Sequence, residues 1–211
     1  MSLEDKVKDK ESKGFIKKAG RLAWKLGMAA ATTALSVPLV GTLGVAVGGA
    51  FAAGSLIANV ARGNSFYKSL DKALTTYSAV NAVIYPVVLL GNMTFPLIPN
   101  SDLAGKIMRG VYASTIYNAA FIGAYNAASH MVDNYLNPKG ISKTIKTDFF
   151  RDWWQLGLMF SPFYYLAANN IAGISMHHAM TGYKSAPTFA VGALPTGFGH
   201  NYLNPINAKK H

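Results

Sequence analysis

The side chains that could do chemistry in this chain lie at positions that do not suit catalysis. After position 11 carboxylates become scarce, and those that remain fall at or beyond the ends of long uncharged stretches: Asp71, Asp102, Asp133, Asp148 and Asp152. Proton-coupled carriers usually place an acid or a base inside the membrane, so this pattern disfavours that mechanism. The chain also has no Gly-x-Ser-x-Gly nucleophile motif and no phosphate loop ending in Lys-Ser or Lys-Thr. We therefore predict a protein that is not an enzyme.

Metal and cofactor binding find equally little support. The chain has no cysteine, which excludes disulfides and thiolate ligands. No His-Glu-x-x-His motif is present. We expect His130 and His177 to lie at opposite ends of antiparallel helices, where they could not share a metal or a haem. The sequence therefore predicts no cofactor and no metal.

Uncharged polar residues, in contrast, follow helical faces. They recur at spacings of three, four and seven, which place side chains on one stripe of a helix. Lipid cannot satisfy such groups, so we expect the stripes to face the interior of a helical bundle. They could form hydrogen bonds between helices, or line a hydrated path for a small neutral solute. The candidate interior residues are Asn81, Tyr85, Asn118, Asn126, Ser129, Gln155 and Asn169.

The helices that carry these stripes are predicted to cross a membrane. Charged residues make up only 14% of the chain, whereas a soluble domain carries roughly a quarter. Four stretches without Asp, Glu, Lys or Arg exceed the roughly 20 residues that a spanning helix needs. The fold class that we predict is an all-α integral membrane bundle over 26–180, with spans of about 40–61, 74–95, 110–132 and 153–176.

The first uncharged stretch, 26–61, is too long for one straight span. Pro38 and Gly41 could break it into an apolar lead-in and a span, and a hairpin of two half-spanning helices is the less favoured alternative. Gly44 and Gly48 form a small-xxx-small pattern that lets two helix backbones approach closely. We expect packing within the chain more than self-association.

The N-terminal segment, 1–25, is predicted to be a basic amphipathic segment on an anionic membrane surface. The net charge of the chain is +11, and this basic cluster leads directly into an apolar run, which favours lipid over nucleic acid. The segment could lie in the interface or simply extend the first span. The residues that we expect at the membrane surface are Lys13, Lys17, Lys18, Arg21, Lys25, Trp153 and Trp154.

The last segment, 181–211, is rich in glycine, proline and aromatic residues and shows no helical period. We predict an extended C-terminal tail that docks onto its own bundle or onto another subunit. With four spans, the side that holds both termini carries more Lys and Arg than the other, so both termini are expected on the cytoplasmic side.

These expectations favour a small polytopic membrane protein without chemistry of its own. We predict an accessory or structural subunit of a larger membrane assembly, with anionic lipid and other membrane subunits, or a second copy, as partners. The alternative is a small channel or facilitator for a neutral solute that uses the inward polar stripes. No nucleic acid partner is expected.

Overall fold

The computed structural model describes residues 3–99, 101–170 and 185–204, with side chains described over 14–99, 101–159 and 191–204. Every regular element in these ranges is a helix, as predicted. The α-helices are α1 (Leu3–Val40), α2 (Leu43–Ala61), α3 (Phe66–Thr94), α4 (Leu103–Tyr112), α5 (Asn118–Asp133), α6 (Ile141–Asn170) and α8 (Ser185–Leu203). A short 3₁₀ helix, Phe95–Leu97, follows α3, and one π-helical segment, Ala113–Tyr117, joins α4 to α5.

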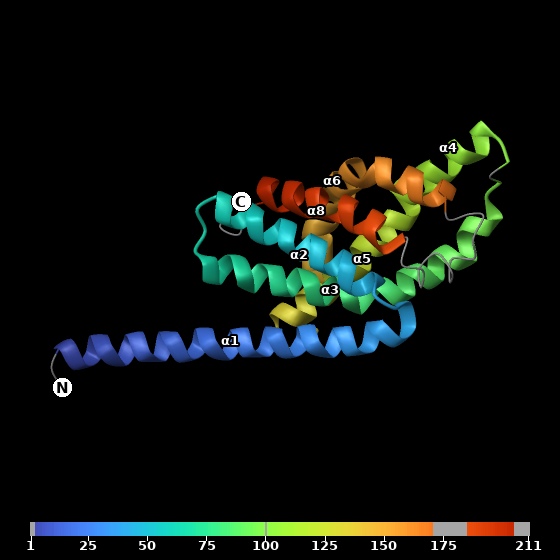
Figure 1. The fold of residues 1–211 in the computed structure, drawn as a ribbon. Helices are drawn as coiled ribbons and strands as arrows, with labels where there is room; N and C mark the ends of the chain where they lie inside the picture. Colours follow the sequence, from blue (N-terminus) through green and yellow to red (C-terminus); the bar gives the residue numbers. More distant parts are fainter. Residues whose placement is uncertain (1–2, 100, 171–184, 205–211) are drawn as a thin grey trace.

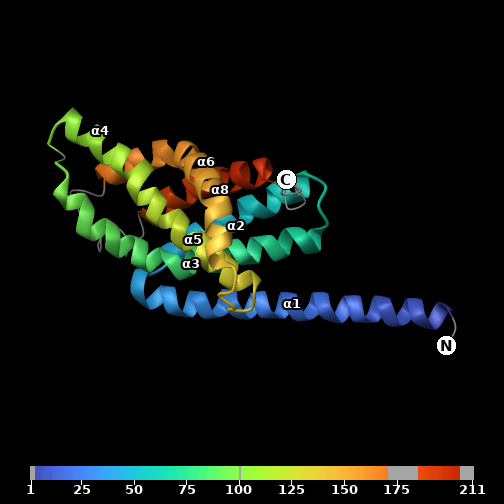
Figure 2. The same cartoon turned by 180° about the vertical axis from the view of Figure 1, so that it is seen from behind.

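The first three helices run back and forth along one direction, and the later helices pack over them (Figures 1 and 2). α1 is the longest, at about 57 Å for its 38 residues. Its N-terminal part extends past the rest of the bundle in both views. In Figure 2 the first half of α6 runs steeply across the direction of α1 and α3.

Glycines with positive φ form the tight connections between neighbouring helices. Gly41 (φ 59°) joins α1 to α2, Gly63 (φ 77°) joins α2 to α3, and Gly140 (φ 89°) precedes α6. Residues with a Cβ atom are disfavoured in this left-handed region, whereas glycine enters it freely. These turns let consecutive helices reverse direction within a few residues.

Among the described residues, three helices are long and apolar enough to cross a membrane: Gly14–Val40, Leu43–Ala61 and Phe66–Leu97. The expected spans at 40–61 and 74–95 therefore fall on α2 and α3. The expectation for 26–61 was wrong in its preferred form, because both halves are long helices joined at Gly41 and not a lead-in followed by one span. The spans expected at 110–132 and 153–176 fall on α4–α5 and on α6, with 171–176 outside the described residues.

The basic N-terminal segment continues into the first helix without a break. As a result, the connection between α2 and α3 lies at the same end of the bundle as the N-terminal segment. The carbonyl of Lys18 accepts a hydrogen bond from Tyr67 Oη at 2.9 Å, and Arg62 near the end of α2 donates to the carbonyl of Tyr202 on α8. The start of α3, the connection 62–65 and the last turn of α8 therefore lie at the same end as the basic part of α1, where the four-span topology separated the N-terminus from 62–73. We call this the basic end.

The extended C-terminal tail is corrected by the structure: Ser185–Leu203 is the helix α8. It packs along α2 through glycine, so closely that a Cβ at Gly54 would lie 2.3 Å from the carbonyl oxygen of Leu194. Gly197 approaches the backbone of Phe51 in the same way, at 2.6 Å. Here the packing face consists of small residues, so the helix shows no apolar period for sequence analysis to detect.

The close approach of α2 and α8 gives a test of the fold with a matched control on the same helix. Gly54→Ala should destabilise the protein by about 1–3 kcal/mol, the usual cost of overpacking, because α8 has to move away. Gly49→Ala should be neutral or stabilising by about 0.5–1 kcal/mol, because nothing lies within 4 Å of a Cβ there. Thermal unfolding in detergent measures both variants, and equal stability would contradict the α2–α8 contact.

Candidate functional site

The best-defined polar site is a buried ion cluster that joins α1, α3 and α5. The side chain of Lys25 is only 1% exposed, and its Nζ lies 2.8 Å from Asp71 Oδ2 and 2.6 Å from Asp133 Oδ1. It also donates to Thr75 Oγ1. A buried ammonium is costly unless carboxylates surround it, so these contacts hold α1 in one register against α3 and α5.

Arg21 and Trp24 complete this cluster on the side of α1. Arg21 donates from Nε and Nη2 to the two carboxylate oxygens of Asp71, at 2.8 and 3.1 Å. Trp24 Nε1 donates to the carbonyl of Val132 at 2.8 Å, which occupies an acceptor in the last turn of α5. The Trp24 ring also packs on Tyr135, with 5.3 Å between centroids.

A second ion cluster joins α6 to α8. His200 Nε2 lies 3.1 Å from Asp152 Oδ1, and the Asp152 side chain is only 4% exposed. Arg151 pairs with Asp152 at 2.8 Å and with Asp148 at 3.2 Å. Lys72 on α3 interacts electrostatically with Asp133, Asp148 and Asp152 and so links the two clusters.

We call the two clusters together the charge belt. It contains Arg21, Lys25, Asp71, Lys72, Asp133, Asp148, Arg151, Asp152 and His200. It lies near the basic end and ties α1, α3, α5, α6 and α8 to one another.

Two carboxyl groups of the charge belt, those of Asp133 and Asp152, have a pKa that favours their ionised form. Burial raises the pKa of Asp133, but Lys72, Lys25 and the hydroxyl of Thr75 outweigh it, so the pKa of Asp133 lies below its ordinary value. Burial likewise raises the pKa of Asp152, and His200 and Arg151 lower it to a net value below the ordinary one. These carboxylates act as fixed anions, as ion-paired structural groups do.

Three of the residues expected at helix contacts meet in one place, between α2 and α3. Asn81 is buried, accepts a hydrogen bond from Ser36 Oγ at 2.9 Å and donates to the carbonyl of Tyr77 at 3.0 Å. Its amide lies directly over Gly44 and Gly48, where a Cβ would come within 2.8 and 2.6 Å of Asn81 side-chain atoms. The two glycines form a notch that receives the amide.

Asn118 has a comparable position between α5 and α6. Its Nδ2 donates to the carbonyl of Trp153 at 2.9 Å, and a Cβ on Gly157 would lie 2.9 Å from that same nitrogen. In return, Trp153 Nε1 donates to the carbonyl of Thr115 at 2.9 Å. Thr115 belongs to the π-helical segment, where the ordinary helical pairing of carbonyls is interrupted. The indole nitrogen of Trp153, which was expected at the membrane surface, therefore binds backbone of a neighbouring segment, and the side chain is half-buried.

The other residues singled out by sequence divide between interior and surface. Asn126 and Ser129 are buried, whereas Tyr85 is 39% exposed, so the expectation that it faces the interior was wrong. Gln155 is half-buried and accepts a hydrogen bond at 2.6 Å from Asn204, which directly follows α8.

On the membrane-surface side, Lys25 is corrected to a buried position in the charge belt, which Arg21 joins at partial exposure. Lys17, Lys18 and Trp154 are exposed. The side chains of Lys13 and Asn169 lie outside the described residues.

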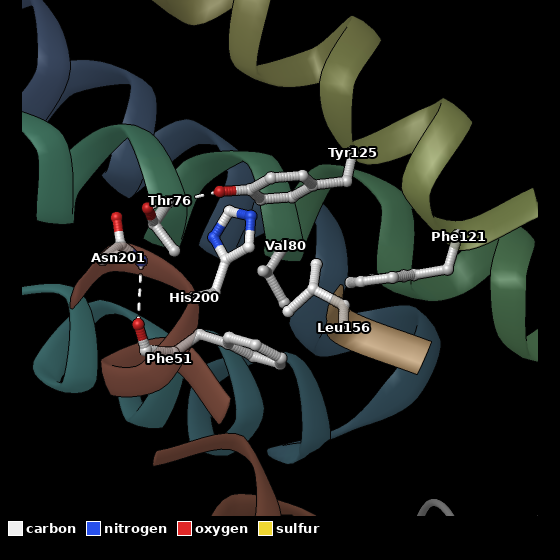
Figure 3. Close-up of a pocket in the computed structure, with 9 residues that line it drawn as sticks. Phe51, Thr76, Val80, Phe121, Tyr125, Leu156, His200 and Asn201 are labelled. Carbon is white, nitrogen blue, oxygen red and sulfur yellow. Dashed lines mark hydrogen bonds between the residues drawn. The ribbon is translucent and has the colours of Figure 1, made fainter. Parts of the chain in front are cut away.

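A small cavity lies beside the charge belt, between α2, α3, α5, α6 and α8 (Figure 3). The imidazole of His200 and the hydroxyls of Thr76 and Tyr125, which lie 3.4 Å apart, meet at one end of it. A histidine oriented by a carboxylate can act as a general base. This cavity has room for about one water molecule, and the His200–Asp152 pair joins α6 to α8 beside it.

Three further polar atoms on α3 and α5 are buried and have no hydrogen-bond partner among the described residues: Ser78 Oγ, Asn126 Nδ2 and Ser129 Oγ. Asn126 and Ser129 belong to the polar stripe identified from sequence. Such groups cost about 1–3 kcal/mol each when they stay unpaired. They leave hydrogen-bonding capacity unmet on the buried faces of α3 and α5.

Sequence reasoning missed the charge belt as a unit. Its acids were expected at the ends of the spans, and Asp148 and Asp152 lie within the helix α6. Arg21 and Lys25 were expected at the membrane surface. A usable signal was present, because Lys25 and Lys72 each lie at the edge of an uncharged stretch, next to residues of helical period. Pairing them with Asp71 and Asp133 requires knowledge of which helices are neighbours.

Comparisons of the chain with protein-family models, with curated proteins and with solved structures find no match. The function therefore has to be argued from the geometry of this chain alone.

The charge belt predicts a large effect of removing its most buried cation. Lys25→Met leaves Asp71 and Asp133 without the ammonium between them, and breaking a buried ion pair in this way costs about 3–5 kcal/mol. Since the side chain of Asp133 is 35% exposed, we expect the lower end, about 3 kcal/mol. Lys17→Met, at an exposed position on the same helix, is the control and should change stability by at most about 0.5 kcal/mol. Equal unfolding temperatures of the two variants in detergent would refute the cluster.

The same carboxylates predict a pH dependence of stability. The pKa values of Asp133 and Asp152 are lower in the folded protein than the roughly 3.9 of a free Asp. Below that value the unfolded chain binds more protons than the folded protein, so the free energy of unfolding rises with pH. Their contribution is full above about pH 4 and is lost as the pH falls further. Asp152→Asn should show a shallower pH dependence in chemical unfolding; slopes that match the unmodified protein would contradict the assignment.

Proposed function

We propose that this chain is an integral membrane protein that serves as a non-enzymatic accessory or structural subunit of a larger membrane assembly. The observation that carries the proposal is how the interior is used. Its polar and charged side chains bind other helices: Lys25 binds two carboxylates, Asn81 and Asn118 bind neighbouring segments, and Asp152 binds His200. An interior committed to helix contacts suits a scaffold.

The outer surface supports the same role. Large apolar residues are exposed over the long helices, as expected where lipid or another subunit covers them. On α4 they follow one stripe with a spacing of four: Leu103, Ile107 and Val111 are 68%, 50% and 56% exposed. The opposite face of α4 packs against α6. We propose this stripe as the contact with a neighbouring subunit.

In this role both termini face the cytoplasm. The basic part of α1, the start of α3 and the last turn of α8 lie at the basic end, which supports an even number of crossings. The α5–α6 connection follows close by, because Asp133 at the end of α5 pairs with Arg21 and Lys25. Exposed lysines such as Lys17, Lys68 and Lys143 lie at this end, as the excess of basic residues on cytoplasmic segments requires. The predicted spans at 40–61 and 74–95 fall on α2 and α3, which together with α1 are the described helices long and apolar enough to cross a membrane. We assign further crossings to α4–α5, the second half of α6 and α8.

A channel or facilitator is the alternative. The unpaired Ser78, Asn126 and Ser129 atoms favour it. Against it, the neighbouring cavity has room for about one water molecule, and Asn81 and Asn118 are engaged by other helices. The geometry therefore supports the accessory subunit better.

Site-specific photo-crosslinking in native membranes tests the accessory role. A photoreactive residue at Ile107 or Val111 should give adducts with a different protein, because these positions lie on the exposed α4 stripe. The same residue at Ile122, which is 0% exposed, is the control and should give none. Electrophoresis and mass spectrometry identify the adducts.

Two outcomes would overturn the proposal. One is that Ile107 and Val111 yield lipid adducts alone while the extracted protein migrates as a single chain. The other is that the adducts contain only a second copy of this chain, which would make it a homo-oligomer and not a subunit of a mixed assembly.

A further inference from the structure

The charge belt has a consequence for the cations outside it. Five carboxylates follow position 11, and Asp71, Asp133, Asp148 and Asp152 all belong to the belt. The fifth, Asp102, caps the start of α4 by accepting from the backbone nitrogen of Gly105 at 2.7 Å. The carboxylates of this part of the chain are therefore committed to internal structure.

The exposed lysines at the basic end are left without such partners. Lys68 follows the α2–α3 turn, Lys139 lies in the α5–α6 connection, and Lys143 and Lys146 lie in the first turns of α6. All four are exposed, and none forms an ion pair with a carboxylate in the described part of the chain. An uncompensated group of cations attracts a polyanion.

The exposed face of α6 indicates which polyanion. Along this face, at spacings of three and four, stand Lys143, Lys146, Phe150, Trp154 and Leu158. Phe150, Trp154 and Leu158 are 71%, 57% and 66% exposed. The order along the helix is thus cation, aromatic ring, aliphatic side chain. Because the first half of α6 runs across α1 and α3, this face lies along the membrane surface, where lysines reach lipid phosphates and aromatic residues are preferred.

We propose that the start of α6 and the adjoining α5–α6 connection form a binding surface for anionic phospholipid headgroups. Lys139, Lys143 and Lys146 bind the phosphate and the negatively charged headgroup, while Phe150 and Trp154 lie at the level of the glycerol and the upper acyl chains. This inference rests on the membrane placement of the proposed function.

Nucleic acid is the competing polyanion and fits this face less well. A nucleic acid would meet the lysines, but it would leave Trp154 and Leu158 exposed to water along the same stripe. Burying these apolar side chains in lipid is favourable by about 25 cal/mol per Å² of surface removed from water. The continuous face is therefore assigned to lipid.

Quenching of tryptophan fluorescence by brominated lipid tests the proposal on the full chain. The protein is reconstituted into bilayers of phosphatidylcholine with an equal small fraction of either brominated phosphatidylglycerol or brominated phosphatidylcholine. We expect the anionic lipid to quench more strongly, with Trp154→Phe removing most of the difference. Lys143→Glu and Lys146→Glu should each lower the preference, by about fivefold per lysine, as should high salt. Lys106→Glu, an exposed lysine on α4 away from the basic end, is the matched control and should retain it.

The outcomes separate this proposal from the one on which it rests. Equal quenching by both lipids, or equal loss in Lys106→Glu and Lys143→Glu, would overturn the headgroup surface and leave the membrane placement intact. Absence of quenching by either lipid would overturn the membrane placement itself. Displacement of the anionic-lipid preference by a soluble oligonucleotide would assign the lysines to nucleic acid. Lys143→Gln with Lys146→Gln, checked by circular dichroism, repeats the test if the charge reversals do not fold.

Discussion

The structure depends on one constraint: an ammonium group removed from water has to be met by anions. Lys25 on α1 is enclosed by Asp71 on α3 and Asp133 at the end of α5, so three helices that are far apart in sequence can pack in only one register around it. Lys72 carries the same requirement toward α6, where Asp148 and Asp152 lie. Asp152 also pairs with His200, and this contact joins α6 to α8. The relative positions of the helices are thus set by ion pairs in the charge belt and by close packing elsewhere.

Close packing away from the charge belt relies on glycine. Inside lipid, apolar side chains gain little by leaving the solvent, so helices associate through near-backbone contacts and interhelical hydrogen bonds. Both appear here together. Gly44 and Gly48 receive the amide of Asn81, and Gly157 lies against Asn118. In each case the asparagine amide occupies space that a Cβ on the facing glycine would take. The glycine and the asparagine therefore depend on each other.

The sequence analysis predicted the helical class and the regions of α2 and α3, because a long run without charge has few other structures open to it. It failed where the information lies in which helices are neighbours. Lys25 resembles a membrane-surface lysine until Asp71 and Asp133 are placed beside it. α8 resembles an extended tail, since the glycines that let it approach α2 also remove the apolar period. Tyr85 shares a helical stripe with Asn81 and is still 39% exposed. Only part of that stripe is covered by neighbouring helices, and the sequence does not say which part.

The pairing of α2 with α8 also has a consequence for biosynthesis. The glycine face of α2 around Gly54 is completed by Leu194 and Gly197, which are made about 140 residues later. At ribosomal rates of 5–20 residues per second, that delay is on the order of 10 s. During this interval the second helix of the chain is already made while its permanent neighbour does not yet exist. The nascent protein must keep that face free of foreign helices until α8 has been made, so the contact between α2 and α8 forms late compared with the contacts among α1, α2 and α3.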